Sequence, residues 1–319
     1  MSLSPIAKLT LEGLHGIAKL LARTGFSGIR RMGEAMGALL WHCLPARRRL
    51  AIDAIKHHLK VDEQEATRIA RASFGHNGRS FFEILLAGQF GFHLAKTPHP
   101  DGGRPPFSTE FSEQITTLRI VGVEQLNAMV GHEGPIVGIT GHIGAWELLA
   151  GLLAEYGDQK PRMVVMRRNK NKVMNELIMR LRGARGLEVL DHRRAVFTVL
   201  KGLKRNGVAA FLVDHNCSRD EAIFLPFLGD LAAVNMGPAL LALRAEALVW
   251  PVFLVREAGG YIFHINAPLD TRTLEGDRQE KIAAIAGFYT QAAEDIVRQY
   301  PEQWFWMHKR WKTRPEPEA

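Results

Sequence analysis

The stretch "PIVGITGHIGAWELLAGLLAE", residues 135–155, joins a short apolar run to a longer helical pattern. The run "PIVGIT" has the length of a buried strand, and the residues after it repeat apolar side chains at helical spacing. Gly141 and Gly144 flank His142 at the junction, where they permit an unusual backbone conformation. The stretch therefore predicts a strand that ends in a tight turn and leads into a helix.

The same alternation continues through the C-terminal part of the chain. Short apolar runs occur at 162–166 "RMVVM", 187–190 "LEVL", 208–213 "VAAFLV" and 248–255 "LVWPVFLV". Helical patterns separate them at 144–156, 170–184, 193–205 and 236–246, and we expect a further strand in "GGYIFHINAP" (259–268) and a closing helix over 278–299. Buried runs alternating with helices are typical of a mostly parallel sheet flanked by helices, so the predicted fold class is α/β.

The N-terminal region has a different character. Residues 5–42 repeat apolar side chains at helical spacing among lysines and arginines, and residues 1–49 hold eight Lys/Arg against two Glu, which is +6 of the net +8. Basic amphipathic helices of this kind lie in a membrane interface or pack as a cap on the rest of the domain, and both readings stay open. Helical spacing continues over 47–60 and 63–88.

These patterns divide the chain into three segments. We expect residues 1–95 to form an N-terminal helical region, membrane-associating under the first of these readings, and residues 96–110 to form a loop with four prolines and two glycines. Residues 111–319 form the α/β core, and we expect the whole to be one continuous structural unit.

Composition limits the classes of protein. With 46% hydrophobic and 23% charged residues the chain is globular, and no apolar run is long enough to predict a transmembrane helix. The N-terminus lacks the pattern of a secretory signal. The two cysteines, Cys43 and Cys217, give no disulfide framework and fit a reducing compartment. No helix–turn–helix, zinc finger or RNA-binding motif is present, so we expect no nucleic-acid partner.

The junction itself suggests chemistry. His142 and Glu147 are five residues apart, which is about 140° around a helix, so they can meet only if His142 lies on the turn before the helix. An imidazole oriented by a carboxylate is a general base for a hydroxyl, and ligands bind at the carboxyl ends of strands in open α/β sheets. A capping histidine with a solvent-facing helix glutamate is the alternative.

Other patterns are less specific. "DHNCSRD" (214–220) lacks the second Cys or His pair of a metal site, and we predict no metal. Arg167 and Arg168 follow a strand and would either clamp a phosphate or form a solvated face. The tail "PEQWFWMHKRWKTRP" (301–315) mixes aromatic and basic side chains, which suits a lipid interface or a nucleic-acid stack, with a buried C-terminal anchor as the alternative.

Taken together, several segments resemble a known family. "TGHIGAWE" (140–147), "LVDHN" (212–216), "FLPFLGDLAAVNMGPALLALRAEALVWPVFLVRE" (224–257) and the tail 301–315 are similar, in this order, to the bacterial lipid A biosynthesis lauroyl/myristoyl acyltransferases, a branch of the lysophospholipid acyltransferases. The resemblance extends over roughly residues 15–315. It implies a glycerophosphate acyltransferase-like fold.

The resemblance also implies an activity. Members of this family move an acyl chain from acyl carrier protein to a hydroxyl of a lipid A precursor, without a cofactor, a metal or a covalent acyl-enzyme. The resemblance places the enzyme on the cytoplasmic face of the inner membrane, either peripheral or anchored by its N-terminus. The expected partners are therefore acyl carrier protein, a lipid A precursor or related glycolipid, and the inner-membrane surface.

Roles carry over position by position. His142 matches the family's catalytic histidine and Glu147 the acid that orients it. Arg182 stands where the family has an important arginine, and Asp214 matches an acidic residue after a central strand; with Arg167 and Arg168 we assign them to substrate binding.

Two positions can be set against the family's pattern. Ala145 departs from it, because the family commonly has Asn there, whereas His215 after Asp214 fits it. Three alternatives remain open: an acyltransferase for another glycolipid or a lysophospholipid, a thioesterase, and a non-catalytic membrane-binding protein.

Overall fold

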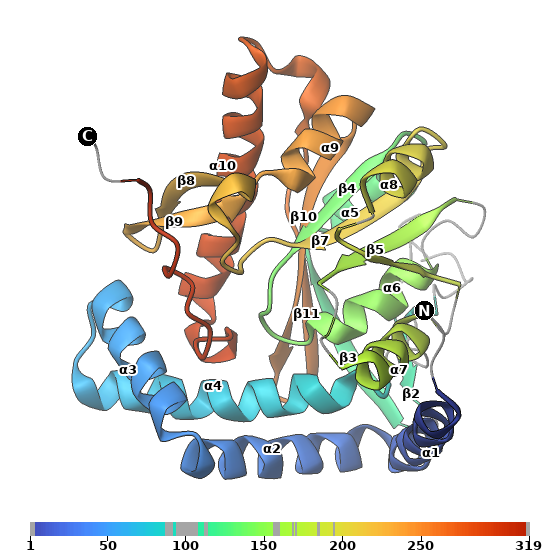
Figure 1. Ribbon diagram of the computed structural model, residues 1–319, viewed down its shortest axis with the longest axis vertical. Coiled ribbons are helices and arrows are strands. Elements are labelled where there is room, and N and C mark those ends of the chain that lie inside the picture. Colours follow the sequence, from blue (N-terminus) through green and yellow to red (C-terminus); the bar gives the residue numbers. More distant parts are fainter. Residues whose placement is uncertain are drawn as a thin grey trace, which may run out of the picture.

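A mixed β-sheet with helices on both faces forms the body of the molecule (Figure 1). The computed structural model describes residues 4–86, 92–93, 108–111, 114–155, 160–167, 169, 171–183, 186–193 and 195–316. Arg168 lies outside these residues, and so does most of the predicted loop 96–110, of which residues 108–110 belong to a strand.

Within the described residues the main sheet contains ten strands, in the order β1-β2-β3-β11-β10-β4-β7-β5-β6 with β12 beside β10. The strands are β1 (Phe92–His93), β2 (Ser108–Phe111), β3 (Gln114–Val121), β4 (Ile136–Thr140), β5 (Arg162–Met166), β6 (Glu188–Asp191), β7 (Val208–Leu212), β10 (Leu248–Glu257), β11 (Gly260–Ile265) and β12 (Leu269–Asp270). The run β10-β4-β7-β5-β6 is parallel throughout, which confirms the α/β prediction.

The register of β4 against β7 decides where the site lies. These neighbouring parallel strands end together, with Thr140 opposite Leu212, and the backbone N–H of Val213 still donates to the Thr140 carbonyl (3.0 Å). The residues that follow the two strands therefore lie side by side. His142 and Asp214 are each two positions beyond this last pair.

Helices cover both faces of the sheet. The side chains of α8 (Ala195–Leu203), α9 (Gly237–Ala245) and α10 (Arg278–Gln299) share one apolar core with the sheet, and those of α5 (Val123–Gly131) share a second core. The expected helix over 144–156 begins instead with a 3-10 turn, η1 (Trp146–Leu148), and continues as α6 (Leu149–Glu155). The pattern at 170–184 becomes α7 (Lys172–Arg182).

One hairpin was not predicted from the sequence. Strands β8 (Ala222–Phe227) and β9 (Asp230–Asn235) pair antiparallel outside the main sheet. Leu228 and Gly229 form its two-residue turn with φ of 52° and 89°, the positive values of a turn whose twist matches that of the strands. The hairpin packs against α10.

The N-terminal helices are α1 (Pro5–Ala22), α2 (Gly25–Cys43), α3 (Pro45–Leu59) and α4 (Glu63–Glu83). Helices α2 and α4 lie side by side, and α4 also contacts η1 and the turn η4 (Pro301–Gln303) that follows α10 (Figure 1). Among the described residues no helix is both long enough and apolar enough to cross a bilayer.

Candidate active site

His142 and Asp214 form a hydrogen-bonded pair at the carboxyl ends of β4 and β7. The His142 Nδ1 lies 2.8 Å from Oδ1 of Asp214, and the backbone N–H of His142 donates to the other carboxylate oxygen at 2.7 Å. Asp214 is buried, whereas the His142 side chain keeps 23% of its surface exposed. The imidazole is therefore held at one nitrogen and open at its other edge.

The carboxylate determines the state of the ring. Burial by itself would raise the pKa of Asp214, but the charge and hydrogen bond of His142 hold that pKa well below its ordinary value. An ionised carboxylate only accepts hydrogen bonds, so Nδ1 of His142 carries the proton and donates it to Asp214. The lone pair of a neutral ring then lies on Nε2, where a general base needs it.

The C-terminal tail packs behind His142 and Asp214 and hydrogen-bonds to both of them. The indole N–H of Trp304 donates to Oδ2 of Asp214 (2.8 Å), and the backbone N–H of Phe305 donates to the His142 carbonyl (3.1 Å). Trp304 and Trp306 are fully buried, and the Trp311 indole donates to the Phe227 carbonyl. Of the readings of the tail, the structure confirms the buried anchor.

The prediction that Glu147 orients His142 is wrong, because the two side chains have different partners in the structure. Glu147 instead binds Arg182 through two hydrogen bonds, Nε to Oε2 at 2.9 Å and Nη2 to Oε1 at 2.6 Å. Glu147 sits in η1, and its carboxylate faces the end of α7 rather than the histidine. The acid that orients His142 is Asp214. Because Asp214 is buried behind the base, it does not face a substrate, contrary to the substrate-binding role predicted for it.

Arg182 stays charged within this pair. Its burial alone would lower its pKa, but the charge and hydrogen bonds of Glu147 raise that pKa above the ordinary value. Among the described residues, its remaining nitrogen, Nη1, faces only the weak acceptor sulfur of Met166 at 3.4 Å. This edge of the guanidinium is left to bind a stronger acceptor.

His142 opens onto a cavity of about 990 Å³ that also receives Trp146, Glu147 and Arg182. One part of the lining is polar and includes Arg167, Asn169, His192, Asn216, Asp220 and Glu221. Another part is apolar and includes Leu118, Leu126, Met129, Leu149, Trp250 and Phe263. The cavity thus brings Arg167, which is exposed, to the same space as Arg182.

A stack of neutral imidazoles lies against the base. The His215 ring is parallel to that of His142 (centroids 3.5 Å apart, 2° between planes), and His308 stacks on His215 at 4.1 Å. Burial lowers the pKa of His215 well below its ordinary value and that of His308 to about 4. Both rings therefore stay uncharged at neutral pH, and neither opposes a proton on His142.

The stacking of His142 on His215 also determines whether these residues could bind a metal ion. His142, Asp214 and His215 offer ligand atoms within 4.8 Å of one another. Two parallel rings 3.5 Å apart direct their lone pairs in separate planes, which do not meet at one ion.

Burial raises the pKa of the nearby Cys217 thiol to about 11, so Cys217 remains protonated at neutral pH and is a poor nucleophile.

The turn after His142 depends on glycine and packs tightly. Gly144 has φ of 59°, and a Cβ atom there would lie 2.2 Å from the Leu254 carbonyl oxygen. Ala145 follows with no exposed surface in an apolar cluster, where its backbone N–H donates to that same carbonyl (2.7 Å). The position at which the resemblance leads one to expect Asn is thus a core position in this chain.

Sequence reasoning missed the part that Trp304 and His308 play in the site. They lie 90 or more positions after Asp214, and no spacing rule links such distant residues. The signal that was available is the density of tryptophan and histidine in the tail.

Known proteins are similar to this chain in sequence. The lipid A biosynthesis lauroyltransferase of Escherichia coli is 27% identical over 198 residues, 62% of this chain and 62% of that protein. A phosphatidylinositol mannoside acyltransferase of Mycolicibacterium smegmatis is 25% identical over 201 residues, 61% of this chain and 62% of that protein. The chain thus matches less than two thirds of the length of either relative.

A solved structure and a family model complete the comparison. The 1-acyl-sn-glycerophosphate acyltransferase PlsC of Thermotoga maritima superposes with a TM-score of 0.35 at 10% identity, covering 82% of this chain and 98% of that one. A TM-score this low supports no conclusion about this chain. A model of the bacterial lipid A biosynthesis acyltransferases, however, matches residues 13–313, nearly the whole length. The chain therefore belongs to the bacterial lipid A biosynthesis acyltransferase family.

Proposed function

We propose that this protein transfers a fatty acyl chain from the thioester of acyl carrier protein to a hydroxyl of a lipid A precursor. The observation that carries the proposal is the His142–Asp214 pair, which opens onto a cavity with a polar and an apolar part. Membership of the lipid A acyltransferase family supports the choice of substrate class.

The reaction needs only a base and two substrates. Nε2 of His142 takes the proton from the acceptor hydroxyl as its oxygen attacks the thioester carbonyl. Asp214 stabilises the imidazolium that forms, in the way a buried carboxylate does in a hydrolase triad. The C–S bond then breaks, the ester remains on the acceptor, and the leaving thiolate takes the proton from His142.

Negative charge on the carbonyl oxygen needs a donor. The backbone N–H groups of His142, Gly144 and Ala145 already donate to Asp214, Gln303 and Leu254, so the turn does not offer them. Arg182 lines the same cavity, and within the part of the chain that the structure describes its Nη1 faces only the sulfur atom of Met166. Arg182 is therefore our candidate for stabilising this charge, and Glu147 positions it.

The two parts of the cavity suit the two ends of the substrates. The apolar part would hold the acyl chain, since burial of hydrocarbon there is favourable. Arg167, together with Arg168 beside it in the sequence, would meet phosphate groups of the acceptor. In this proposal no cofactor or metal takes part.

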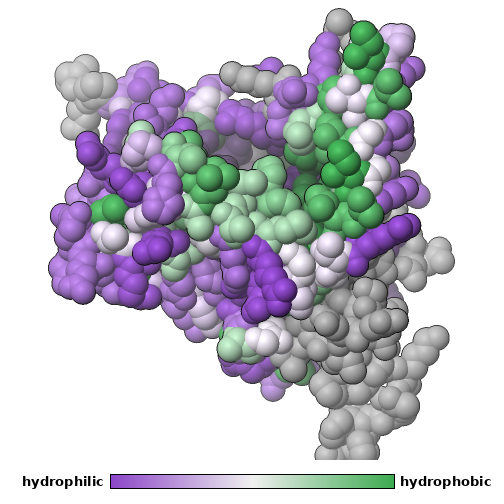
Figure 2. All heavy atoms as spheres, turned by 90° about the horizontal axis from the view of Figure 1, so that it is seen from below, coloured by the Kyte–Doolittle hydropathy of each residue, from purple (hydrophilic) through white to green (hydrophobic). Residues whose placement is uncertain are grey.

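The acceptor lies in a membrane, and the protein offers a surface to meet one. On α1 the side chains of Ile6, Leu9, Ile17 and Leu20 are 54–79% exposed. Figure 2 shows hydrophobic side chains along the right of the face seen from below, where α1 lies, with hydrophilic ones beside them. We propose that the protein is peripheral, held by this helix on the cytoplasmic face of the bacterial inner membrane.

A second acceptor class has support of its own. The similar mycobacterial protein is named for a mannoside, so another glycolipid is a real alternative to a lipid A precursor. The base and its acid would serve both acceptors equally. Hydrolysis of the thioester by water is a third outcome that the same pair permits.

The test is a mass-resolved transfer assay. Purified full-length protein in detergent is given acyl carrier proteins loaded with chains of several lengths and a lipid A precursor. We expect product heavier by one acyl group, and we expect His142→Ala to abolish it. The control is His57→Ala, which removes a histidine that also pairs with an aspartate, Asp230, at the exposed surface and outside the lining of the cavity. Transfer at the normal rate by His142→Ala would refute the mechanism; release of free fatty acid would indicate a thioesterase.

A further inference from the structure

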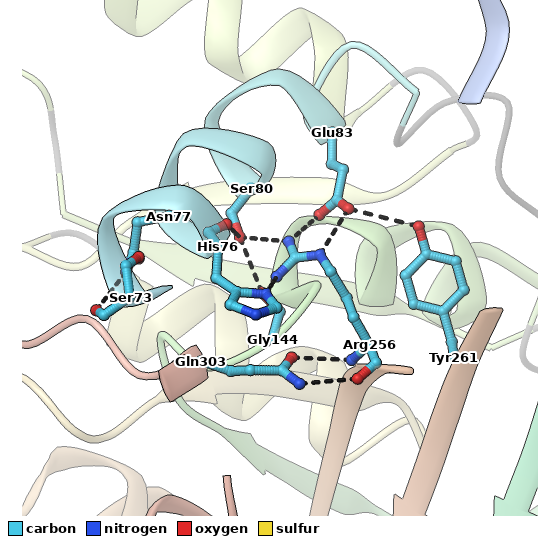
Figure 3. Close-up of polar contacts among 9 residues, drawn as sticks. All are labelled: Ser73, His76, Asn77, Ser80, Glu83, Gly144, Arg256, Tyr261 and Gln303. Atoms are coloured by element: carbon cyan, nitrogen blue, oxygen red, sulfur yellow. Dashed lines mark hydrogen bonds and ion pairs between the residues drawn. The ribbon is translucent and has the colours of Figure 1, made fainter. Parts of the chain in front are cut away.

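A polar stripe runs along the buried side of α4. Ser73, Asn77, Ser80 and Glu83 are all less than 7% exposed, and His76 lies among them at the same helical spacing. Buried polar side chains destabilise a protein unless each finds a partner. The partners in this molecule are Arg256 of β10, the Gly144 carbonyl in the turn after His142, and the Trp304 carbonyl in the tail. Figure 3 shows the first two of these.

The strongest contact in the stripe is a buried ion pair. Arg256 of β10 donates through Nε to Oε1 of Glu83 at 3.0 Å and through Nη2 to the other carboxylate oxygen. Both side chains are only 3% exposed. Gln303 fixes the backbone of Arg256, because its amide accepts from the Arg256 N–H (2.9 Å) and donates to the Arg256 carbonyl (2.8 Å).

The ion pair orients a hydroxyl. Nη2 of Arg256 donates to Oγ of Ser80 at 2.7 Å, so one lone pair of that oxygen is occupied. The hydroxyl then donates to the carbonyl of Gly144, 2.8 Å away and only two residues after His142. Figure 3 shows this chain from Glu83 through Arg256 and Ser80 to Gly144.

The same stripe also fixes Trp304, the residue that binds Asp214 from behind. Ser73 donates through its hydroxyl to the Trp304 carbonyl at 2.5 Å, and Asn77 donates to that carbonyl at 3.3 Å. Trp304 in turn donates to Asp214 through its indole (2.8 Å). One helix thus fixes both the turn beside the base and the tryptophan behind its carboxylate.

We propose that Ser80, oriented by the Glu83–Arg256 ion pair, is a positioning residue that fixes the turn carrying His142 for acyl transfer. The proposal rests on the assignment of His142 as the base. Ser80 touches no substrate and acts through the Gly144 carbonyl. Its loss would let the turn shift, and small displacements of a catalytic group reduce turnover strongly.

The first variant is Ser80→Ala, which removes one hydroxyl from a helix that accepts alanine well. We expect kcat to fall by about tenfold to a hundredfold with KM for the acyl donor unchanged. The matched control is Thr271→Val, which removes a buried hydroxyl that donates to the Ala247 carbonyl (2.9 Å) at the opposite end of β10. This control should lose stability to a similar degree and keep its kcat.

A second variant separates positioning from stability. Glu83→Met combined with Arg256→Met replaces the buried pair by apolar side chains and leaves no unpaired charge, so the chain should still fold. Ser80 then keeps its hydroxyl but loses the donor that orients it. We expect kcat to fall as in Ser80→Ala at temperatures well below the melting temperature.

A readout without substrate keeps the two proposals apart. Hydrogen–deuterium exchange should rise in peptides covering 141–148 for Ser80→Ala and not for Thr271→Val. Normal kcat and normal exchange in Ser80→Ala, with only its stability reduced, would overturn the positioning role. Increased exchange in a protein whose wild type transfers no acyl group would support the positioning of the turn and refute the proposed reaction.

Discussion

At the scale of single residues, two acids with different partners flank one cavity. Asp214 receives three hydrogen bonds and keeps His142 in the tautomer of a base, whereas Glu147 holds Arg182 by two. The two carboxylates are both buried, but each holds a different side chain: Asp214 holds the imidazole of His142 and Glu147 the guanidinium of Arg182. Their replacement should therefore have different consequences.

For the first acid, Asp214→Asn should lower kcat by about a hundredfold to ten-thousandfold, because an amide can donate to Nδ1 and so favour the wrong tautomer. Circular dichroism would check that the variant folds. Steady-state transfer from acyl carrier protein is the measurement, and a loss of less than tenfold would contradict the role we give Asp214.

For the second acid, Glu147→Gln and Arg182→Gln should have similar effects, and the double variant should be little worse than either. Residues that act as one unit show such non-additivity, typically with coupling of about 0.5–3 kcal/mol. The measurement is a double-mutant cycle on kcat/KM. Effects that simply add would show that the two side chains act independently.

His76 makes stability depend on pH. Burial, with the charges of Arg256 and Arg79, lowers the pKa of His76 to about 3, while an unfolded chain binds this proton near pH 6.5. Between those values the unfolded state holds more protons, so stability falls as the pH falls. From pH 6.5 to pH 5 the loss from His76 alone is about 1.6 kcal/mol.

His76→Gln should therefore flatten the dependence of unfolding free energy on pH between 5 and 7. Urea denaturation at several pH values measures the slope. An unaltered slope in His76→Gln would mean that the neutral ring contributes no such linkage.

At the scale of elements, α2 and α4 pack backbone against backbone. A Cβ atom on Gly78 would lie 2.1 Å from the Gly33 carbonyl oxygen, and one on Gly37 would lie 2.4 Å from that of Phe74. These contacts run antiparallel along the two helices, so small residues set the spacing between them.

Gly78→Ala should force the helices apart and cost about 1–3 kcal/mol of stability, as overpacking usually does. Gly75 is the matched control, since it lies on the same helix with nothing within 4 Å of its Cβ position. Gly75→Ala should stabilise by about 0.5–1 kcal/mol through helix propensity. Thermal unfolding of both variants tests this, and equal melting temperatures would contradict the tight crossing.

At the scale of the whole molecule, the exposed apolar strip and the cavity define how the protein would meet its substrates. Ile6, Leu9, Ile17 and Leu20 fall within one narrow sector of α1, and Lys8 and Lys19 lie next to them in the sequence. Apolar burial combined with attraction to anionic headgroups is how interfacial helices bind. Helix α1, which carries this strip, contacts α7, the helix that ends with Arg182.

Leu9→Glu and Leu20→Glu should each weaken binding to vesicles of anionic phospholipid by at least about tenfold, because a buried leucine contributes about 1.5–3 kcal/mol. Co-sedimentation with vesicles measures the partition. Leu231→Glu, an exposed leucine on β9 outside the strip, should bind normally. Equal binding by all three variants would exclude α1 as the contact.

The sequence by itself determined the order and type of most elements, because strand and helix periodicities are local. It also determined that His142 lies beyond a strand, and the motifs around it gave the family. It did not determine the partner of His142. Glu147, five residues away, looked like the acid, but register between β4 and β7 places Asp214 there instead.

Only the tertiary structure decided the contacts that link distant segments. Trp304 behind Asp214, and Ser80 against Gly144, join residues 90 and 64 positions apart, and no local pattern encodes such pairs. The hydrogen bonds of a buried polar side chain depend on which element packs against it. For that reason the stripe on α4 was visible in the sequence only as a helix, and its function followed from the fold.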